Sequence, residues 1–276
     1  MEIVEELGHT HTLDKSHLAP VADHFYAEAA RIGYEVGVPN EYRMLPYKHQ
    51  LPSPQRGLSA VDAAEAMRTI GSCRRYKPDH VPDEVVYRAV EAARFAPQGG
   101  NRQPTRLVVV RDRALKERLR DLYLVPWRAY YKAASAGSQA LGEHDSAQKA
   151  ADAANRFAEN LAEVPLIIVV CARIDALQVT DRDQGRPSVV GGASIYPFVQ
   201  NLCIALRVEG VATTITTLLC EYESEVKELL GIPDEYLTAC HVAAGYPEGG
   251  FPTKLRRMAV EEIAFVDRFG ESIGGP

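Results

Sequence analysis

The chain has 276 residues, of which 46% are hydrophobic and 25% charged, and its formal net charge is -6 at pH 7. These values are ordinary for a globular protein with a sizeable core, built as one large or two small domains. The acidic balance, without a face dense in lysine or arginine, excludes a nucleic-acid partner, so any phosphate site is local.

The cysteines and the N-terminal residues predict a cytoplasmic protein without a membrane partner. Residues 1–16 lack the basic and apolar regions of a secretory signal, and no apolar run approaches the roughly 20 residues that span a membrane. No CxxC pair occurs, and several cysteines lie in apolar runs, where a free thiol behaves as a small hydrophobic group. The cysteines are Cys73, Cys171, Cys203, Cys220 and Cys240.

Residues 1–57 are predicted to be an N-terminal extension and linker, and residues 58–276 the main domain. A helix is expected over 20–31, whereas residues 46–57 hold three prolines and a glycine, a composition typical of an extended linker. Three histidines of the extension could ligate a metal, but a polar segment near a terminus favours a solvated tail, so we predict no metal site. These histidines are His9, His11 and His17.

A basic turn follows the linker and leads into a helix. Ser59 is expected to cap a first helix whose apolar face comprises Val61, Ala64, Met67 and Ile70. Hydrogen-bond donors and positively charged side chains then stand just before Pro82. This proline and its acidic neighbour mark a helix N-terminus, and donors, charge and helix N-terminus together suit an anion. The residues of the turn that carry these groups are Ser72, Arg74 and Arg75.

The helix that starts near Pro82 leads to a loop rich in glycine and amides. Its apolar residues recur at helical spacing and Pro97 closes it. The glycines of the loop allow close approach of a ligand, and Asn101 and Gln103 can each donate and accept hydrogen bonds, which suits the polar edge of a heterocycle. Residues 107–110 are expected to be a buried strand.

The middle of the chain is predicted to be helical before the sheet resumes. An amphipathic surface helix is expected over 113–122. An alanine-rich helical insert then covers about 123–163 and carries the aromatic residues Trp127, Tyr130 and Tyr131. These rings can pack helices together or line a substrate lid, and both interpretations stay open.

The remaining elements alternate between strands and helices. Residues 165–172 form an apolar run typical of a central strand buried on both faces, and 173–187 a polar loop. An apolar helix is expected over 191–209, strands over 211–219 and 238–245, and a short helix over 224–230. His241, inside the last strand, is interpreted as a core histidine with its hydrogen bonds satisfied and not as a general base.

Five motifs occur in the order and spacing of a known family. They are the basic turn with its Pro82 helix, APQGGNRQP at 96–104, GGASIYPFVQNLCIALRVEGVATTITTLL at 191–219, ELLGIPDEY at 228–236, and VAAGYPEGG with PTKLRR at 242–257. By these motifs the chain resembles the FMN-dependent nitroreductase family over about residues 60–268. Neither GxGxxG after a strand nor GxxxxGK[ST] is present, so a Rossmann or P-loop site is not supported.

The resemblance implies an α+β fold, a nitroreductase-like sandwich in which helices flank a central, mostly antiparallel sheet. It also implies an intertwined homodimer, with the helix at 191–209 in the interface, residues 263–266 added to the partner's sheet and the flavin at the subunit boundary. FMN is the implied cofactor and NADPH or NADH the electron donor. The insert at 123–163 corresponds to the lid, which makes Trp127, Tyr130 and Tyr131 the expected substrate-binding residues.

Matching motif positions implies the residues that bind FMN. The basic turn meets the phosphate and ribityl chain, the amide loop meets the flavin, the backbone near Thr217 lies over N5, and a C-terminal KxR pair returns to the phosphate. The expected set is Ser72, Arg74, Arg75, Pro97, Gln98, Gly99, Asn101, Gln103, Thr216, Thr217, Leu218, Lys254 and Arg256. One departure stands out, because Ile70 and Gly71 stand where the family turn has its leading arginines. Either Arg68, Arg75 or a residue of the extension replaces that charge, or the cofactor binds less tightly.

The function implied is that of an NAD(P)H-dependent oxidoreductase that reduces nitroaromatics, quinones or another small acceptor. It would work by ping-pong hydride transfer through flavin N5, with no catalytic side chain of its own. Two alternatives stay open. One is a reductive dehalogenase or a flavin-destroying enzyme on the same scaffold, and the other is a non-catalytic flavin-binding storage or sensor protein.

Overall fold

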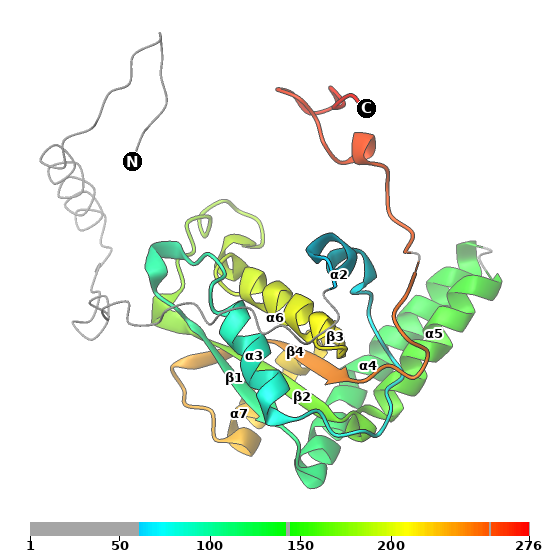
Figure 1. Ribbon diagram of the computed structural model, residues 1–276, viewed down its shortest axis with the longest axis vertical. Helices are drawn as coiled ribbons and strands as arrows, with labels where there is room; N and C mark the ends of the chain where they lie inside the picture. Colours follow the sequence, from blue (N-terminus) through cyan, green and yellow to red (C-terminus); the bar gives the residue numbers. More distant parts are fainter. Residues whose placement is uncertain (1–60, 142–143, 254, 276) are drawn as a thin grey trace, which may run out of the picture. The chain divides into compact units, whose positions relative to one another are not determined.

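The computed structural model of the chain describes residues 61–141, 144–253 and 255–275. Its centre is an antiparallel sheet of four strands in the order β1-β2-β4-β3 (Figure 1). The strands are β1 (Thr105–Val110), β2 (Leu166–Arg173), β3 (Ala212–Thr216) and β4 (Tyr236–Gly245). This α+β architecture confirms the predicted fold class. The predicted extension, its histidines and Ser59 lie outside the described residues.

Strand β2 is the centre of the sheet because its sequence is apolar on both faces. All of its residues except Arg173 are buried, as predicted for the apolar run at 165–172. Leu166, Ile168 and Val170 face one hydrophobic cluster, while Ile167 and Val169 face another. Burying each such side chain contributes roughly 1.5–3 kcal/mol, so β2 joins the two halves of the core.

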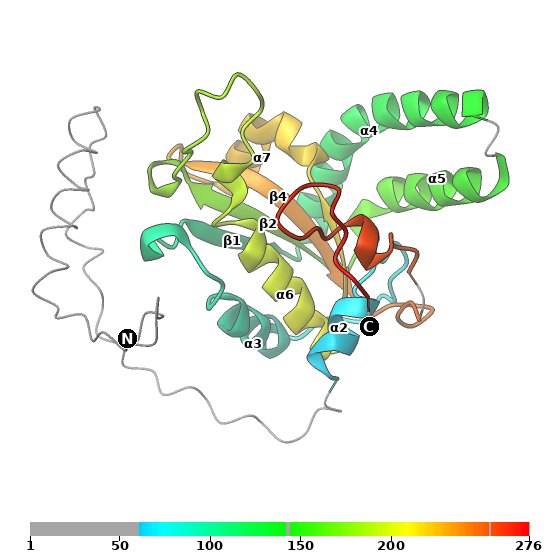
Figure 2. The same cartoon turned by 90° about the horizontal axis from the view of Figure 1, so that it is seen from above.

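Helices cover both faces of the sheet (Figure 2). On one face, α3 (Asp83–Ala93) and α6 (Tyr196–Val208) pack on the first cluster, and the short α2 (Ala63–Thr69) packs against α6. The opposite face carries α4 (Arg113–Leu141), α5 (His144–Glu159) and α7 (Glu223–Leu230). Short 3-10 turns complete the chain at Gly99–Asn101, Leu161–Glu163, Ile174–Ala176, Val190–Gly192, Leu218–Tyr222 and Val260–Glu262.

Helix α3 begins where the sequence predicts, but it ends at Ala93, four residues before the Pro97 that was expected to close it. Pro82 is its N-cap, and Val85, Val86, Ala89 and Ala93 are buried at helical spacing. The expected face of α2 is wrong, because Asp62 is the N-cap and Ala66 is the buried residue. Ala64 and Met67, two of the residues expected on its apolar face, are exposed. With only seven residues, α2 presents a single small contact to α6.

Two strand predictions need correction. Residues 107–110 do lie in β1, but only Val110 of this strand is buried, because β1 is an edge strand of the sheet in one chain. The strand expected over 211–219 ends at Thr216, since a 3-10 turn starts at Leu218. Residues 263–266 join no strand of the sheet within one chain, where Phe265 makes an isolated bridge to Ser272, and their addition to a partner's sheet stays a prediction.

Two helix predictions also need correction. Helix α4 does not stop at Leu122 but runs 29 residues to Leu141, with Pro126 inside it. Arginine, leucine, lysine and alanine are good helix formers, so the local sequence continues the helix despite the proline. Helix α6 starts at Tyr196 and not at Gly191, because the glycine pair forms a 3-10 turn and Pro197 is tolerated only in the first helical turn.

Candidate functional site

The basic turn is fixed by hydrogen bonds at one end of the sheet. The backbone N–H of Cys73 donates to the Thr213 carbonyl (2.9 Å), and Lys77 N–H donates to the Tyr246 carbonyl (2.8 Å). The hydroxyl of Tyr76 donates to the Cys73 carbonyl (2.6 Å), and burial raises the pKa of that phenol, which keeps it protonated. Ser72, Arg74 and Arg75 therefore project from a rigid support.

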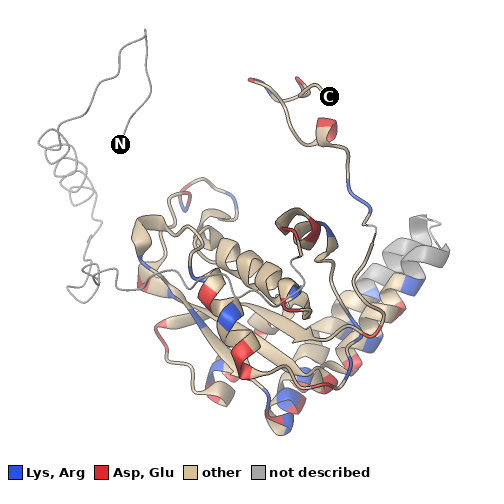
Figure 3. Ribbon diagram, viewed as in Figure 1, with Lys and Arg blue, Asp and Glu red and all other residues tan. Residues whose placement is uncertain are grey.

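A cavity of about 940 Å³ opens beside this turn. Its wall comes from the basic turn, from the C-terminal half of α5 and from the segment that follows β4. Figure 3 shows basic positions on that segment and on the α4–α5 hairpin. Its charged and amide residues are Arg74, Arg75, Arg156, Asn160, Glu163, Glu248 and Arg257.

Positive charge dominates this cavity. Glu163 is already held by the guanidinium of Arg113, which lowers the pKa of that carboxyl. Among the described residues of the wall, Glu248 is therefore the one carboxylate that no arginine pairs, whereas four arginine guanidiniums line the same cavity. Forked guanidinium donors match phosphate oxygens in geometry and charge. The cavity is therefore suited to a phosphate monoester.

The segment that follows β4 is fastened over the helices. Glu248 N–H donates to the carbonyl of Arg75 (3.2 Å), which ties the segment to the basic turn. The guanidinium carbon of Arg207, a buried residue of α6, lies 3.7 Å from the ring centre of Phe251. These contacts place Arg257 in the wall of the cavity. Arg256, the predicted residue, does not line it, and Lys254 lies outside the described residues.

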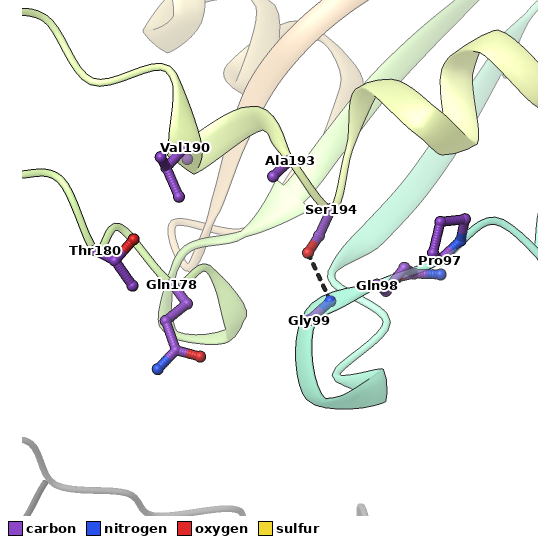
Figure 4. Close-up of a pocket in the computed structure, with 9 residues that line it drawn as sticks. Pro97, Gln98, Gly99, Gln178, Thr180, Val190, Ala193 and Ser194 are labelled. Atoms are coloured by element: carbon purple, nitrogen blue, oxygen red, sulfur yellow. Dashed lines mark hydrogen bonds between the residues drawn. The ribbon is translucent and has the colours of Figure 1, made fainter. Parts of the chain in front are cut away.

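The amide loop has an unusual backbone. Gly100 (φ 60), Asn101 (φ 52) and Gln103 (φ 49) all occupy the left-handed region. A non-glycine residue pays for this conformation, and such residues cluster at ligand sites. The hydroxyl of Ser194 accepts a hydrogen bond from Gly99 N–H (3.0 Å) and holds the loop in place (Figure 4).

A second, smaller cavity of about 380 Å³ lies against this loop. Its lining carries amides and hydroxyls but no charged side chain: Pro97, Gln98, Gly99, Gln178, Thr180, Val190, Gly191, Ala193 and Ser194 (Figure 4). The Oε1 atom of Gln98 is buried and accepts no hydrogen bond from the described residues. A buried acceptor without a donor costs roughly 1–3 kcal/mol, so a ligand N–H would be stabilised here.

Asp181 organises the loop that forms the far wall of this smaller cavity. Its carboxylate accepts hydrogen bonds from Ser188 Oγ (2.6 Å), Arg186 NH1 (2.8 Å) and Val189 N–H (3.3 Å). The Ser188 and Arg186 donors lower the pKa of this buried carboxyl to about 2. The sequence analysis predicted only a polar loop here and missed this function of Asp181.

The two cavities share no lining residue, and the sheet separates them. The basic turn bonds to Thr213 of β3, which is in register with Leu166 at the start of β2. The amide loop instead enters β1 opposite Ala172, near the end of β2. From Leu166 to Ala172 the strand advances about 20 Å. Figures 1 and 2 both show the two segments at opposite ends of the sheet. One chain therefore does not bring Arg74 and Asn101 together.

The predicted threonine peptide lies at the end of β3. Thr216 is half-buried and its hydroxyl lies 3.4 Å from the Tyr123 hydroxyl, while Thr217 is exposed. Leu218 N–H donates weakly to Thr216 Oγ1 (3.5 Å). None of these residues lines either cavity, so their contact with flavin N5 stays a prediction.

The aromatic residues of α4 pack the helical hairpin. Trp127 donates from Nε1 to Asn155 of α5 (2.8 Å) and stacks on Tyr123, and the Tyr131 hydroxyl donates to Asp152 (3.2 Å). Tyr130 is 58% exposed. Trp127 and Tyr131 thus have structural partners, and a substrate-binding role for the three rings stays a prediction.

His241 is buried in β4, as predicted, but its hydrogen bonds are not satisfied. The residue is 1% exposed, and neither ring nitrogen has a partner among the described residues. Burial lowers the pKa of the imidazole to about 4. The ring is therefore neutral near pH 7 and enclosed by apolar atoms, which does not suit a general acid or base.

Metal and membrane sites are not indicated in the part of the chain that the structure describes. No group of three His, Cys, Asp or Glu side chains in this part is arranged to hold a metal ion. No described helix is both long and apolar enough to cross a bilayer. The five cysteines are free thiols.

Comparison with known proteins gives consistent matches. A family model described as "Nitroreductase family" matches residues 68–246. A protein named NADH dehydrogenase from Thermus thermophilus is 27% identical over 234 residues, which cover 75% of this chain and 96% of that protein. Iodotyrosine deiodinase 1 from Mus musculus is 23% identical over 79% of this chain and 74% of its own length.

Solved structures show the same fold. The FMN-dependent nitroreductase NfnB from Mycobacterium smegmatis, solved in complex with NADPH, superposes with a TM-score of 0.54. It is 20% identical to this chain and covers 75% of it, and the match spans 98% of the NfnB chain. At this identity the likeness concerns the fold.

Proposed function

We propose that this chain, which belongs to the nitroreductase family, is an FMN-dependent oxidoreductase that takes electrons from NADH or NADPH and reduces a small organic acceptor. The observation that supports this best is the cavity at the basic turn, where four guanidiniums face one unpaired carboxylate. A phosphate monoester is the ligand chemistry that this excess of arginine fits. When bound there, FMN would supply the redox chemistry that links a reduced nicotinamide to the acceptor.

The donors of each cavity fit one part of FMN. Ser72, Arg74 and Arg75 would hold the phosphate from a turn that the sheet keeps rigid. Gln98, Asn101 and Gln103 offer neutral donors and acceptors, which match the N–H and carbonyl groups of a flavin ring edge. The unpaired Oε1 of Gln98 is an acceptor ready for such an N–H.

A homodimer would join the two half-sites. Because they lie at opposite ends of the sheet in one chain, we propose that the basic turn of one subunit and the amide loop of its partner form each flavin site. The C-terminal segment supports this assembly, since its apolar side chains are exposed in the single chain and would be buried by a second copy. They are Leu255, Met258, Val260, Ile263, Val266, Phe269 and Ile273.

The protein's own contribution is positioning. The main requirement of such a reaction is that the nicotinamide and the acceptor are each held close to the flavin ring in the right orientation. We propose that the backbone N–H near Thr217 faces the reactive part of the ring and that Tyr130, exposed on α4, contacts the acceptor. No proton-transferring side chain is required, and the neutral, enclosed His241 is consistent with that.

The acceptor class is proposed from the family and the relatives. A nitroaromatic or a quinone fits the family name, whereas the match to iodotyrosine deiodinase favours a halogenated phenol as the second candidate. We also propose that residues 58–276 form the flavin domain, so a chain lacking 1–57 is expected to retain FMN.

An anaerobic absorbance titration tests the proposal. The purified protein is expected to show an oxidised flavin spectrum that bleaches with NADH or NADPH and returns when a nitroaromatic is added. Release of iodide from 3-iodotyrosine by the reduced protein would instead select the second candidate. A colourless protein that takes up no added FMN would contradict the proposed function.

A further inference from the structure

Both positions where the family arginines are missing pack closely against neighbouring side chains in this fold. Ile70 packs against the hydrophobic cluster of α3 and α6. A Cβ atom at Gly71 would lie 3.0 Å from Leu255 Cδ2 and 3.2 Å from Pro252 Cγ, so the segment that follows β4 occupies the space of a side chain. The charge that these positions do not supply must come from another element.

Arg156 is placed to supply that charge. It lies in the last turn of α5 and lines the same cavity as Arg74 and Arg75. Its position is fixed from both sides, because the neighbouring Phe157 is buried and Asn155 accepts a hydrogen bond from Trp127 of α4 (2.8 Å). From the sequence, Arg68, Arg75 and the extension were the expected sources of this charge, and α5 was not among them.

The guanidinium of Arg156 is available for a ligand. It makes no ion pair with any carboxylate in the described ranges. The hydrogen bonds from Asn160 (Nδ2, 2.8 Å; backbone N–H, 3.1 Å) go to the backbone carbonyl of Arg156 and not to its guanidinium. The nearby Glu163 is held by both NH groups of Arg113 and so does not compete. Arg68, by contrast, is absent from the wall of the cavity.

We infer that Arg156 binds the phosphate of FMN and replaces, from α5, the charge that Ile70 and Gly71 do not provide. This inference rests on the proposed function. The α4–α5 hairpin then binds the cofactor directly through Arg156, in addition to covering it.

Flavin affinity separates this role from a structural one. FMN and riboflavin share the ring and the ribityl chain, and only FMN carries the phosphate. Full-length protein stripped of flavin is titrated with each compound, and fluorescence quenching gives both Kd values. Arg156→Gln is compared with Arg156→Lys and with Arg118→Gln, a control at an exposed arginine of α4 that does not line the cavity.

The expected result is that Arg156→Gln raises the Kd for FMN about tenfold, the usual size for one charge-assisted hydrogen bond. Its Kd for riboflavin should equal that of the wild type, Arg156→Lys should recover part of the FMN affinity, and Arg118→Gln should change neither value. Unchanged FMN affinity in Arg156→Gln would overturn the inference while leaving the proposed function intact. An equal loss of FMN and riboflavin would overturn it too. If the wild type binds neither compound, the proposed function itself fails.

Discussion

The buried imidazole of His241 predicts a specific dependence of stability on pH. In the unfolded chain a histidine has a pKa near 6.5, whereas burial lowers the pKa of His241 to about 4 in the folded protein. Between these values the unfolded chain binds more protons, so folding stability falls as the pH falls from about 6.5 towards 4. Above pH 6.5 this contribution vanishes, and below pH 4 it is constant.

The two pKa values set the size of the effect. Between pH 7.5 and pH 5 they correspond to a loss of about 2 kcal/mol of unfolding free energy from this one residue. His241→Leu removes the titrating group and both unpaired nitrogens at similar volume. The unfolding free energy of the variant should therefore fall by about 2 kcal/mol less than that of the wild type over this pH range. At pH 7.5 the variant should be more stable than the wild type by roughly 1–3 kcal/mol.

Urea unfolding at both pH values, at equal concentrations of protein and FMN, measures this difference. The carboxyl groups titrate in both proteins, so their contributions to the pH dependence of stability cancel in the comparison. His80→Gln is the matched control, because it removes an exposed histidine and leaves the buried imidazole of His241 in place. Parallel losses in wild type and His241→Leu would show that the imidazole has a hydrogen-bond partner when folded and would refute the reasoning.

Three other predictions concern the candidate site. Arg74→Ala and Asn101→Ala should each lower FMN occupancy after gel filtration without changing the circular dichroism spectrum; full occupancy in both would remove the site assignment. Gly71→Arg should lower the melting temperature by several degrees and not tighten FMN binding, because its Cβ meets Leu255 at 3.0 Å; a lower Kd for FMN would argue against that packing. Asp181→Asn should weaken FMN and riboflavin equally, since it loosens the loop beside the flavin ring; a loss specific to FMN would contradict this.

Local sequence was enough to predict the elements that depend little on which other elements pack beside them. The apolar run at 165–172 is buried on both faces, so its pattern identified β2 without knowledge of its neighbours. Pro82 and Gly231 mark a helix start and a helix end by backbone chemistry alone, and both occur where expected. The edge position of β1 could not be predicted, because it depends on which strands lie beside it.

The candidate site could be predicted only in part, again because some of its residues are placed by the packing of elements that are distant in the sequence. The basic turn and the amide loop are contiguous in sequence, and motif spacing was enough to find them. Arg156 and Asp181 stand far from both motifs. Arg156 reaches its cavity only through the packing of α5, and Asp181 acts on the smaller cavity only by holding the loop after β2. An isolated arginine in an alanine-rich helix carries no local signal of a ligand.

The central claim is that each FMN site is built from the basic turn of one subunit and the amide loop of the other. Heterodimers of Arg74→Ala and Asn101→Ala subunits, isolated with two different affinity tags, test this through their FMN content. The account predicts about half the flavin of the wild-type dimer, because one site receives an unchanged turn and an unchanged loop. Heterodimers as empty as the two mutant homodimers would mean that turn and loop of the same chain hold the cofactor, and would contradict the account.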